Sequence, residues 1–69
     1  MRITVNGEPR QVADDLTLMQ LLQKLDLVVE RIAVEQNRQI VPRSQLAAQK
    51  LSDGDVLEIV TFVGGGSHA

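Results

Sequence analysis

The segment Thr17-Leu18-Met19-Gln20-Leu21-Leu22-Gln23-Lys24-Leu25 decides how the rest of this 69-residue chain can fold. Thr17 and Gln20 have the spacing of a capping box, in which each side chain bonds the backbone of the other residue at a helix start. Asp14 and Asp15 precede it, where negative charge favours the positive end of a helix dipole. Four apolar side chains share one helix face at spacings i, i+3, i+4 and i+7: Leu18, Leu21, Leu22 and Leu25. The segment therefore predicts one short amphipathic helix.

Strand-like segments and turns surround this helix. Arg2–Val5 alternates polar and apolar residues and ends at Asn6-Gly7, a dipeptide typical of a type I′ hairpin turn. The return strand is expected over residues 9–13, where Pro9 suits a sheet edge. The remaining expected elements are strands over residues 31–35, 39–41 and 56–63, turns at 37–38 and 52–55, and a single helical turn over 44–49.

A single helix cannot cover two sheets, so we expect one mixed sheet to wrap it. The first and last strands can then lie side by side in the centre, with the hairpin's return strand and the short strand 39–41 as edges. The predicted fold class is α+β: a β-grasp (ubiquitin-like) domain over residues 1–63, with one four- to five-stranded sheet on one principal helix and a flexible glycine-rich tail at 64–69. The expected core comprises Ile3, Val5, Val12, Leu18, Leu21, Leu22, Leu25, Ile32, Val34, Ile40, Leu46, Leu51, Leu57 and Ile59.

Composition narrows the classes of function. The chain has no cysteine, which excludes disulfides and a thiolate nucleophile. Its net charge of −2 and its single aromatic residue, Phe62, argue against binding nucleic acid through phosphates or base stacking. The start of the sequence lacks the apolar region of a signal peptide, and no apolar run approaches a membrane span. We therefore expect a cytoplasmic protein with neither nucleic acid nor membrane as a partner.

Residues typical of catalytic and metal sites are sparse. His68 is the only histidine, so neither a metal site nor a base for Ser67 has supporting partners. Asp53 and Asp55 lie in a Ser-Asp-Gly-Asp segment, which is interpreted as a turn in preference to a cation site. Gly64-Gly65-Gly66 lacks the helix and lysine that follow a phosphate-binding loop. We expect no catalytic residue, no metal and no bound cofactor.

The most informative feature for function is the C-terminus, where a strand-like run gives way to Gly64-Gly65-Gly66. Glycine has no Cβ, so this backbone is narrow and adopts conformations closed to other residues. Such a segment can enter a tight channel and present a carboxyl group to an enzyme. The alternative interpretation is a frayed terminus or a linker, because disorder concentrates at chain ends.

The last strand carries a second signal. Val60 and Phe62 are expected on the face opposite Leu57 and Ile59, so the two apolar side chains would point away from the helix. Two apolar residues on one face beside the tail predict a docking surface for a partner. We expect Val60, Phe62 and Val63 to form this surface. The alternative is packing of these side chains against a neighbouring loop.

The chain resembles a known family, the ubiquitin-like sulfur-carrier proteins of thiamin biosynthesis (ThiS type). The resemblance covers nearly the whole chain. It rests on the Asn6-Gly7 hairpin, the helix of residues 17–25, the segment from Ala33 to Arg43, Asp53-Gly54-Asp55, and Phe62-Val63-Gly64-Gly65-Gly66. The central segment and the terminus together are fairly specific, whereas each motif alone is weak.

The resemblance implies that Gly66 carries the chemistry. In this family an E1-like adenylyltransferase (ThiF type) uses ATP to adenylate the carboxylate of the terminal glycine. Sulfur from a donor system such as a cysteine desulfurase then replaces AMP, and thiazole synthase (ThiG type) uses the resulting thiocarboxylate. Gly64 and Gly65 would pass through the narrow entrances of these partners. The chain would be a protein co-substrate and not an enzyme, with ATP used by the activating partner.

One departure from the family pattern is the end of the chain. Family members end at the second glycine of the pair, whereas Ser67-His68-Ala69 follow here, so Gly66 has a peptide bond in place of a free carboxylate. The three residues either were added to the natural chain or are native and must be cleaved.

Three alternative functions are left open. The first is the small subunit of molybdopterin synthase, although the proline-rich segment that usually precedes the glycines of that protein is missing here. The others are a sulfur carrier of another pathway and a non-covalent ubiquitin-like interaction module.

Overall fold

The computed structural model describes residues 1–62 of the chain, and the description stops before Val63. The elements in chain order are strand β1 (Arg2–Val5), strand β2 (Glu8–Gln11), helix α1 (Leu18–Lys24), the 3₁₀ turn η1 (Val29–Arg31), strand β3 (Ile32–Gln36), strand β4 (Gln39–Val41), the 3₁₀ turn η2 (Arg43–Gln45) and strand β5 (Val56–Thr61). The helical turn expected over residues 44–49 is therefore a shorter 3₁₀ turn that starts one residue earlier.

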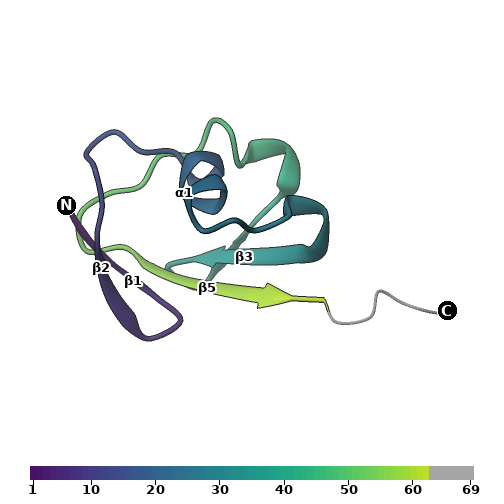
Figure 1. The fold of residues 1–69 in the computed structure, drawn as a ribbon, viewed down its shortest axis with the longest axis horizontal. Helices are drawn as coiled ribbons and strands as arrows, with labels where there is room; N and C mark the ends of the chain where they lie inside the picture. The colour runs from purple at the N-terminus through teal and green to yellow at the C-terminus, as the bar shows by residue number, and fades with distance from the viewer. Residues whose placement is uncertain (63–69) are drawn as a thin grey trace, which may run out of the picture.

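The strands form one five-stranded sheet in the order β2-β1-β5-β3-β4. The central pair, β1 and β5, is parallel, and the other neighbours are antiparallel. Helix α1 lies across one face of this sheet (Figure 1). A mixed sheet wrapped on one helix is the β-grasp arrangement, so the predicted fold class is confirmed, including the central pair and the two edge strands.

Helix α1 begins with the predicted capping box. Thr17 Oγ1 accepts a hydrogen bond from the Gln20 N–H (3.2 Å), and Gln20 Oε1 accepts one from the Thr17 N–H (2.9 Å). The helix buries one face against the sheet: Leu18, Leu21 and Leu22. Leu25 follows the helix as its C-cap and is only partly buried.

Both hairpin turns place two consecutive residues in the left-handed region. Asn6 and Gly7 have φ of 50° and 84°, and Asn37 and Arg38 have φ of 53° and 72°. Positive φ at both central positions is the requirement of a type I′ turn, so both predicted turns are confirmed. The strand after the first turn was predicted less well, because β2 covers Glu8–Gln11 and not residues 9–13.

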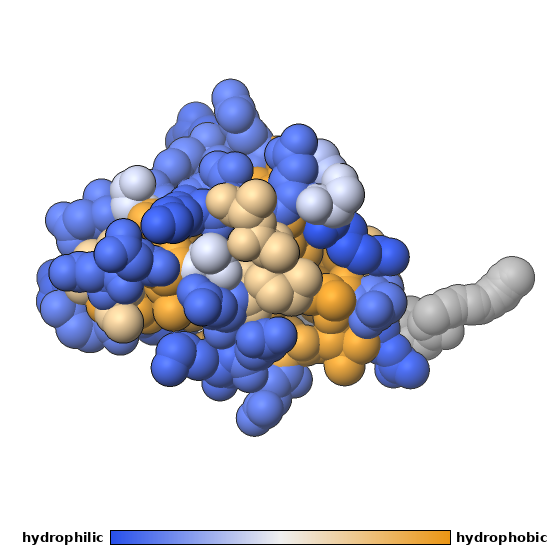
Figure 2. Space-filling view, turned by 90° about the horizontal axis from the view of Figure 1, so that it is seen from above, coloured by the Kyte–Doolittle hydropathy of each residue, from blue (hydrophilic) through white to orange (hydrophobic). Residues whose placement is uncertain are grey.

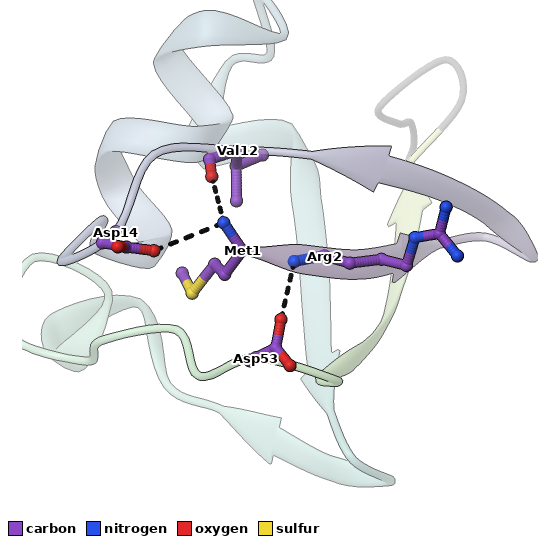
Figure 3. Close-up of polar contacts among 5 residues, drawn as sticks. All are labelled: Met1, Arg2, Val12, Asp14 and Asp53. Carbon is purple, nitrogen blue, oxygen red and sulfur yellow. Dashed lines mark hydrogen bonds and ion pairs between the residues drawn. The ribbon is translucent and has the colours of Figure 1, made fainter.

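The N-terminal end of β1 is bound to two loops (Figure 3). The amino group of Met1 donates to the carbonyl oxygen of Val12 at 2.7 Å and lies 3.3 Å from Asp14 Oδ1. The backbone N–H of Arg2 donates to Asp53 Oδ1 at 2.8 Å. These contacts connect β1 to the segment after β2 and to the turn before β5.

The core is mostly the predicted one, with one error on β4. Ile40 was expected in the core but is 73% exposed, whereas its neighbour Val41 is buried. Val41 lies directly opposite the buried Val34, and adjacent residues of a strand face opposite sides of the sheet, so Ile40 must face outward. Val12 and Leu25 are partly buried, and Leu16, which was not predicted, is buried. The other predicted core residues are confirmed: Ile3, Val5, Leu18, Leu21, Leu22, Ile32, Val34, Leu46, Leu51, Leu57 and Ile59.

Candidate functional site

The predicted site of chemistry lies at the end of the chain, beyond the last strand. Gly64, Gly65 and Gly66, together with Val63 of the predicted docking surface, lie outside the described residues. The structure describes what precedes them: β5, which ends at Thr61, and then Phe62. Strand β5 and its neighbours are therefore the part of the structure that precedes the tail in the chain.

Strand β5 has one buried face and one exposed face. Leu57 and Ile59 face the helix and are 0% and 9% exposed. Val60 and Phe62 are 58% and 50% exposed, as expected from the alternation along the strand. Both apolar side chains are accessible, so no loop within residues 1–62 covers them.

The structure adds a residue that the sequence analysis assigned to the core. Ile40 from β4 is exposed, and together with Ala33, Val60 and Phe62 it forms what we call the outer patch. Ala33 lies directly opposite Val60 across the β3–β5 pair. Ala33, Ile40 and Phe62 line a common hollow of about 210 Å³, which Arg43 also lines. Only the register of β4 reveals Ile40, because the three residues Gln39–Val41 are too few to show a clear alternation.

Two carboxylates lie beside the outer patch. Glu35 on β3 and Glu58 on β5 are directly opposite in register, and Glu35 is also opposite Ile40 on β4. Like charges directly opposite across a sheet are destabilising. The exposed face of the sheet therefore combines apolar side chains with a pair of opposed carboxylates.

Hydrophobic residues also reach the surface on the helix side of the molecule, between hydrophilic ones (Figure 2). Val28 is 54% exposed, and Leu25, Leu27 and Val29 are partly buried against the core. These residues follow helix α1 and are far in sequence from the glycines. The outer patch is the apolar surface that includes residues of β5 next to the tail, so it is the candidate docking surface.

The Asp53-Gly54-Asp55 segment is a turn, as interpreted from the sequence. Gly54 has a φ of +88°, and the Asp55 N–H donates to the Ser52 carbonyl oxygen at 3.0 Å. Asp55 is 7% exposed, and its carboxylate accepts hydrogen bonds from Gln36 Nε2 (2.7 Å), Asn37 Nδ2 (2.9 Å) and the Ser52 N–H (2.8 Å). Burial by itself raises the pKa of Asp55, but the three hydrogen bonds outweigh it and lower the pKa below its ordinary value. Its hydrogen bonds give Asp55 a structural role.

Residues 1–62 contain no group of three or more His, Cys, Asp or Glu side chains placed to hold a metal ion. Within that range the structure also has no helix with the length and apolar character that crossing a membrane requires. The outer patch and the strand that leads to the glycines remain the candidate functional site.

Residues 3–66 match the family model described as the ThiS family. This chain belongs to the ThiS family. A solved structure of the thiamine biosynthesis protein ThiS from Geobacter metallireducens has 38% sequence identity and a TM-score of 0.83, and the match covers 96% of this chain and 100% of that chain. The resemblance seen in the sequence is therefore confirmed at the level of family and fold.

Curated relatives fall into two sizes. The sulfur carrier protein ThiS of Escherichia coli is 36% identical over 66 residues, which cover 96% of this chain and 100% of the relative. A thiazole synthase of Paramagnetospirillum magneticum is 45% identical over 67 residues, which cover 97% of this chain. The chain spans only 21% of the length of that thiazole synthase, and the same share of a second one, from Magnetococcus marinus.

Proposed function

We propose that this ThiS-family chain is a sulfur carrier of thiamin biosynthesis and that Gly66 is the residue that carries the sulfur. The observation that carries the proposal is the match of residues 3–66 to the family model, together with the exposed apolar face of the last described strand. Relatives of the same length are named sulfur carrier protein ThiS. These names favour the thiamin pathway over molybdopterin synthesis as the destination of the sulfur.

The proposed chemistry has three steps at the terminal carboxylate. A carboxylate is a poor electrophile, so it first attacks the α-phosphate of ATP, and pyrophosphate leaves. The resulting acyl-adenylate has a good leaving group, and the terminal sulfur of a donor persulfide displaces AMP at the glycine carbonyl carbon. A second thiol of the donor system then reduces the resulting acyl disulfide, which releases the glycine thiocarboxylate and leaves a disulfide on the donor. The product is a thiocarboxylate, a soft nucleophile at the end of a narrow chain. The carrier binds no cofactor of its own in this scheme, since ATP belongs to the activating enzyme.

The proposed partners are an E1-like adenylyltransferase, a sulfur donor such as a cysteine desulfurase, and thiazole synthase. A segment similar to this chain lies within longer proteins named thiazole synthase, which supports the last of these partnerships. We propose that Val60, Phe62 and Val63 dock on the partners together with Ile40. Gly64 and Gly65 then lead Gly66 into the active site, because they have no side chain to obstruct it.

Ser67, His68 and Ala69 must be absent before the first step. An amide carbonyl within the chain has no carboxylate oxygen to attack ATP, so Gly66 cannot be adenylated while Ser67 follows it. The proposal therefore requires that Gly66 is the C-terminal residue when it is adenylated.

Intact-mass measurement tests this function directly. A chain ending at Gly66 is incubated with the adenylyltransferase, ATP and a sulfur source, and the expected product has one carboxylate oxygen replaced by sulfur on the C-terminal peptide. The chain has no cysteine, so no side-chain thiol can give a confusing signal. A chain ending at Ala69 and a Gly65→Ala, Gly66→Ala double variant are the controls, and both should stay unmodified.

Two outcomes contradict the proposal. Modification of the Ala69-ending chain with Ser67 to Ala69 still attached would exclude a mechanism at the Gly66 carboxylate. Failure of every cognate activating enzyme to modify the Gly66-ending chain would favour a non-covalent interaction module, for which the exposed outer patch is also suited. Such a module would keep its partners after deletion of the glycines.

A further inference from the structure

The last strand is bound by side chains from both hairpin turns. Asn37, in the β3–β4 turn, accepts the Val56 N–H on its Oδ1 at 2.9 Å, at the start of β5. Asn6, in the β1–β2 turn, accepts the Ile59 N–H on its Oδ1 at 2.7 Å and donates from its Nδ2 to the Ile59 carbonyl oxygen at 3.2 Å. Asn6 thus binds both backbone groups of one residue in the half of β5 that is nearer the tail.

Asn6 acts where the β1–β5 pairing stops. The last paired residues are Val5 and Leu57, after which the Asn6 N–H donates to the Leu57 carbonyl oxygen at 2.9 Å. Among residues 1–62 no strand pairs with this side of β5 beyond Leu57. The side chain of Asn6 takes the place of a further residue of β1, because it supplies one acceptor and one donor to Ile59.

The other side of β5 is held further along. Thr61 is paired with Ile32 of β3, and the Phe62 N–H donates to the Arg31 carbonyl oxygen at 2.7 Å. The end of β5 is therefore fixed by the β3 side of the sheet on one edge and by the Asn6 side chain on the other. A strand held on one edge opens more readily than a strand held on both.

We infer that Asn6 is a positioning residue for the C-terminal tail, because its pairing with Ile59 fixes the direction in which β5 leaves the sheet. The inference rests on the proposed function, since direction matters only if the tail must enter a partner while the outer patch is docked. Asn6 touches neither the glycines nor ATP, so its effect is exerted through the strand.

The two turns supply a matched pair of variants. Asn6→Gly removes both bonds to Ile59 and keeps the turn, because glycine adopts positive φ without strain. Asn37→Gly is the control: it makes the same substitution at a second positive-φ asparagine and removes a bond to β5 at the end distant from the tail. It also removes a bond to Asp55, so it should cost at least as much stability. Asn6→Asp keeps the acceptor for the Ile59 N–H but loses the donor.

Hydrogen exchange and transfer kinetics are then measured on chains ending at Gly66. Asn6→Gly should speed exchange of the Ile59 and Phe62 amides, and Asn37→Gly should leave both close to wild type. With the activating enzyme, Asn6→Gly should lower kcat/KM about fivefold relative to Asn37→Gly, the size expected from the net contribution of about one hydrogen bond. Asn6→Asp should fall between wild type and Asn6→Gly. If Asn6 had only a structural role, the losses of kcat/KM in Asn6→Gly and Asn37→Gly would follow the losses of stability of the two variants.

Equal kcat/KM for Asn6→Gly and Asn37→Gly, with the wild type modified normally, would overturn the inference and leave the proposed function standing. Unchanged exchange at Ile59 in Asn6→Gly would overturn it on structural grounds. If Asn6→Gly fails to fold, the comparison is made with Asn6→Asp, which retains one of the two bonds. A wild-type chain that is not modified at all would overturn the proposed function and the inference with it.

Discussion

The carboxylate of Asp55 accepts a 2.7 Å hydrogen bond from the side-chain amide of Gln36, and both side chains are buried. The amide of Gln36 also donates to the Lys50 carbonyl oxygen at 3.2 Å, and its oxygen accepts from Gln49 Nε2 at 2.9 Å. A buried polar group without a partner costs free energy, and here every member has one. This network connects β3, the segment after η2 and the turn that starts β5.

Asp55 makes stability dependent on pH in the acid range. Its pKa in the folded protein is lowered from the ordinary value of 3.8, so folding favours the ionised form. The resulting stabilisation is fully present above the unfolded-state pKa and is lost as the pH falls through the lower, folded-state pKa. Urea denaturation across this range should therefore show a decrease in unfolding free energy toward low pH.

Asp55→Asn is the variant that checks this assignment. The amide places a donor among the donors of Gln36, Asn37 and Ser52, so at neutral pH the variant should lose about 1–3 kcal/mol of stability. The acid-dependent decrease should also become smaller than in the wild type. An unchanged pH profile in Asp55→Asn would mean that other carboxylates cause the acid sensitivity.

Ile40 and Val41 should respond oppositely to truncation, although they are adjacent in sequence. Val41→Ala removes buried apolar surface and should lower the unfolding free energy by about 1–3 kcal/mol. Ile40→Ala should leave the unfolding free energy within about 0.5 kcal/mol of wild type, because Ile40 is exposed. If Ile40 belongs to the docking surface, its truncation should instead weaken partner binding. Denaturation curves measure the unfolding free energies, and titration with the activating enzyme measures the binding affinity. A strongly destabilised Ile40→Ala variant would refute the register of β4.

Phe62→Ala tests the docking surface at its largest side chain. Phe62 is 50% exposed and lies beyond the end of β5, so the fold should be largely retained. Truncation of an aromatic residue at an interface costs about 2 kcal/mol or more when it is a central contact. Calorimetry with the activating enzyme should show this loss of affinity. Unchanged affinity would remove Phe62 from the docking surface, and unfolding of the variant would assign it to the core.

Glu58→Gln tests the charges beside the outer patch. Glu58 and Glu35 lie directly opposite, so removal of one charge should raise the unfolding free energy by less than about 1 kcal/mol. The gain should shrink as the salt concentration rises, because salt screens exposed charges. If a basic group of the partner recognises this pair, the same variant should bind more weakly. A variant that is less stable at low salt would show that the two carboxylates do not repel each other.

Local interactions explain why so much of the fold was predictable. The capping box of Thr17 and Gln20, the leucine spacing of α1 and the Asn6-Gly7 turn each depend on residues a few positions apart. A single helix then requires one sheet to cover it, which is sufficient to predict the β-grasp arrangement. The glycines of the tail were also recognised from the sequence, because the lack of a side chain is a property of each residue alone.

The amino-acid sequence by itself determined the helix, the turns, the family and the residue proposed to carry the sulfur. Tertiary structure alone decided the side of the sheet on which Ile40 lies, because that depends on the register between β3 and β4. It alone paired Asn6 with Ile59, which are separated by 53 positions, and it alone buried Asp55 beside Gln36. Such contacts join residues distant in sequence, and no local pattern specifies which of many equivalent polar side chains will meet.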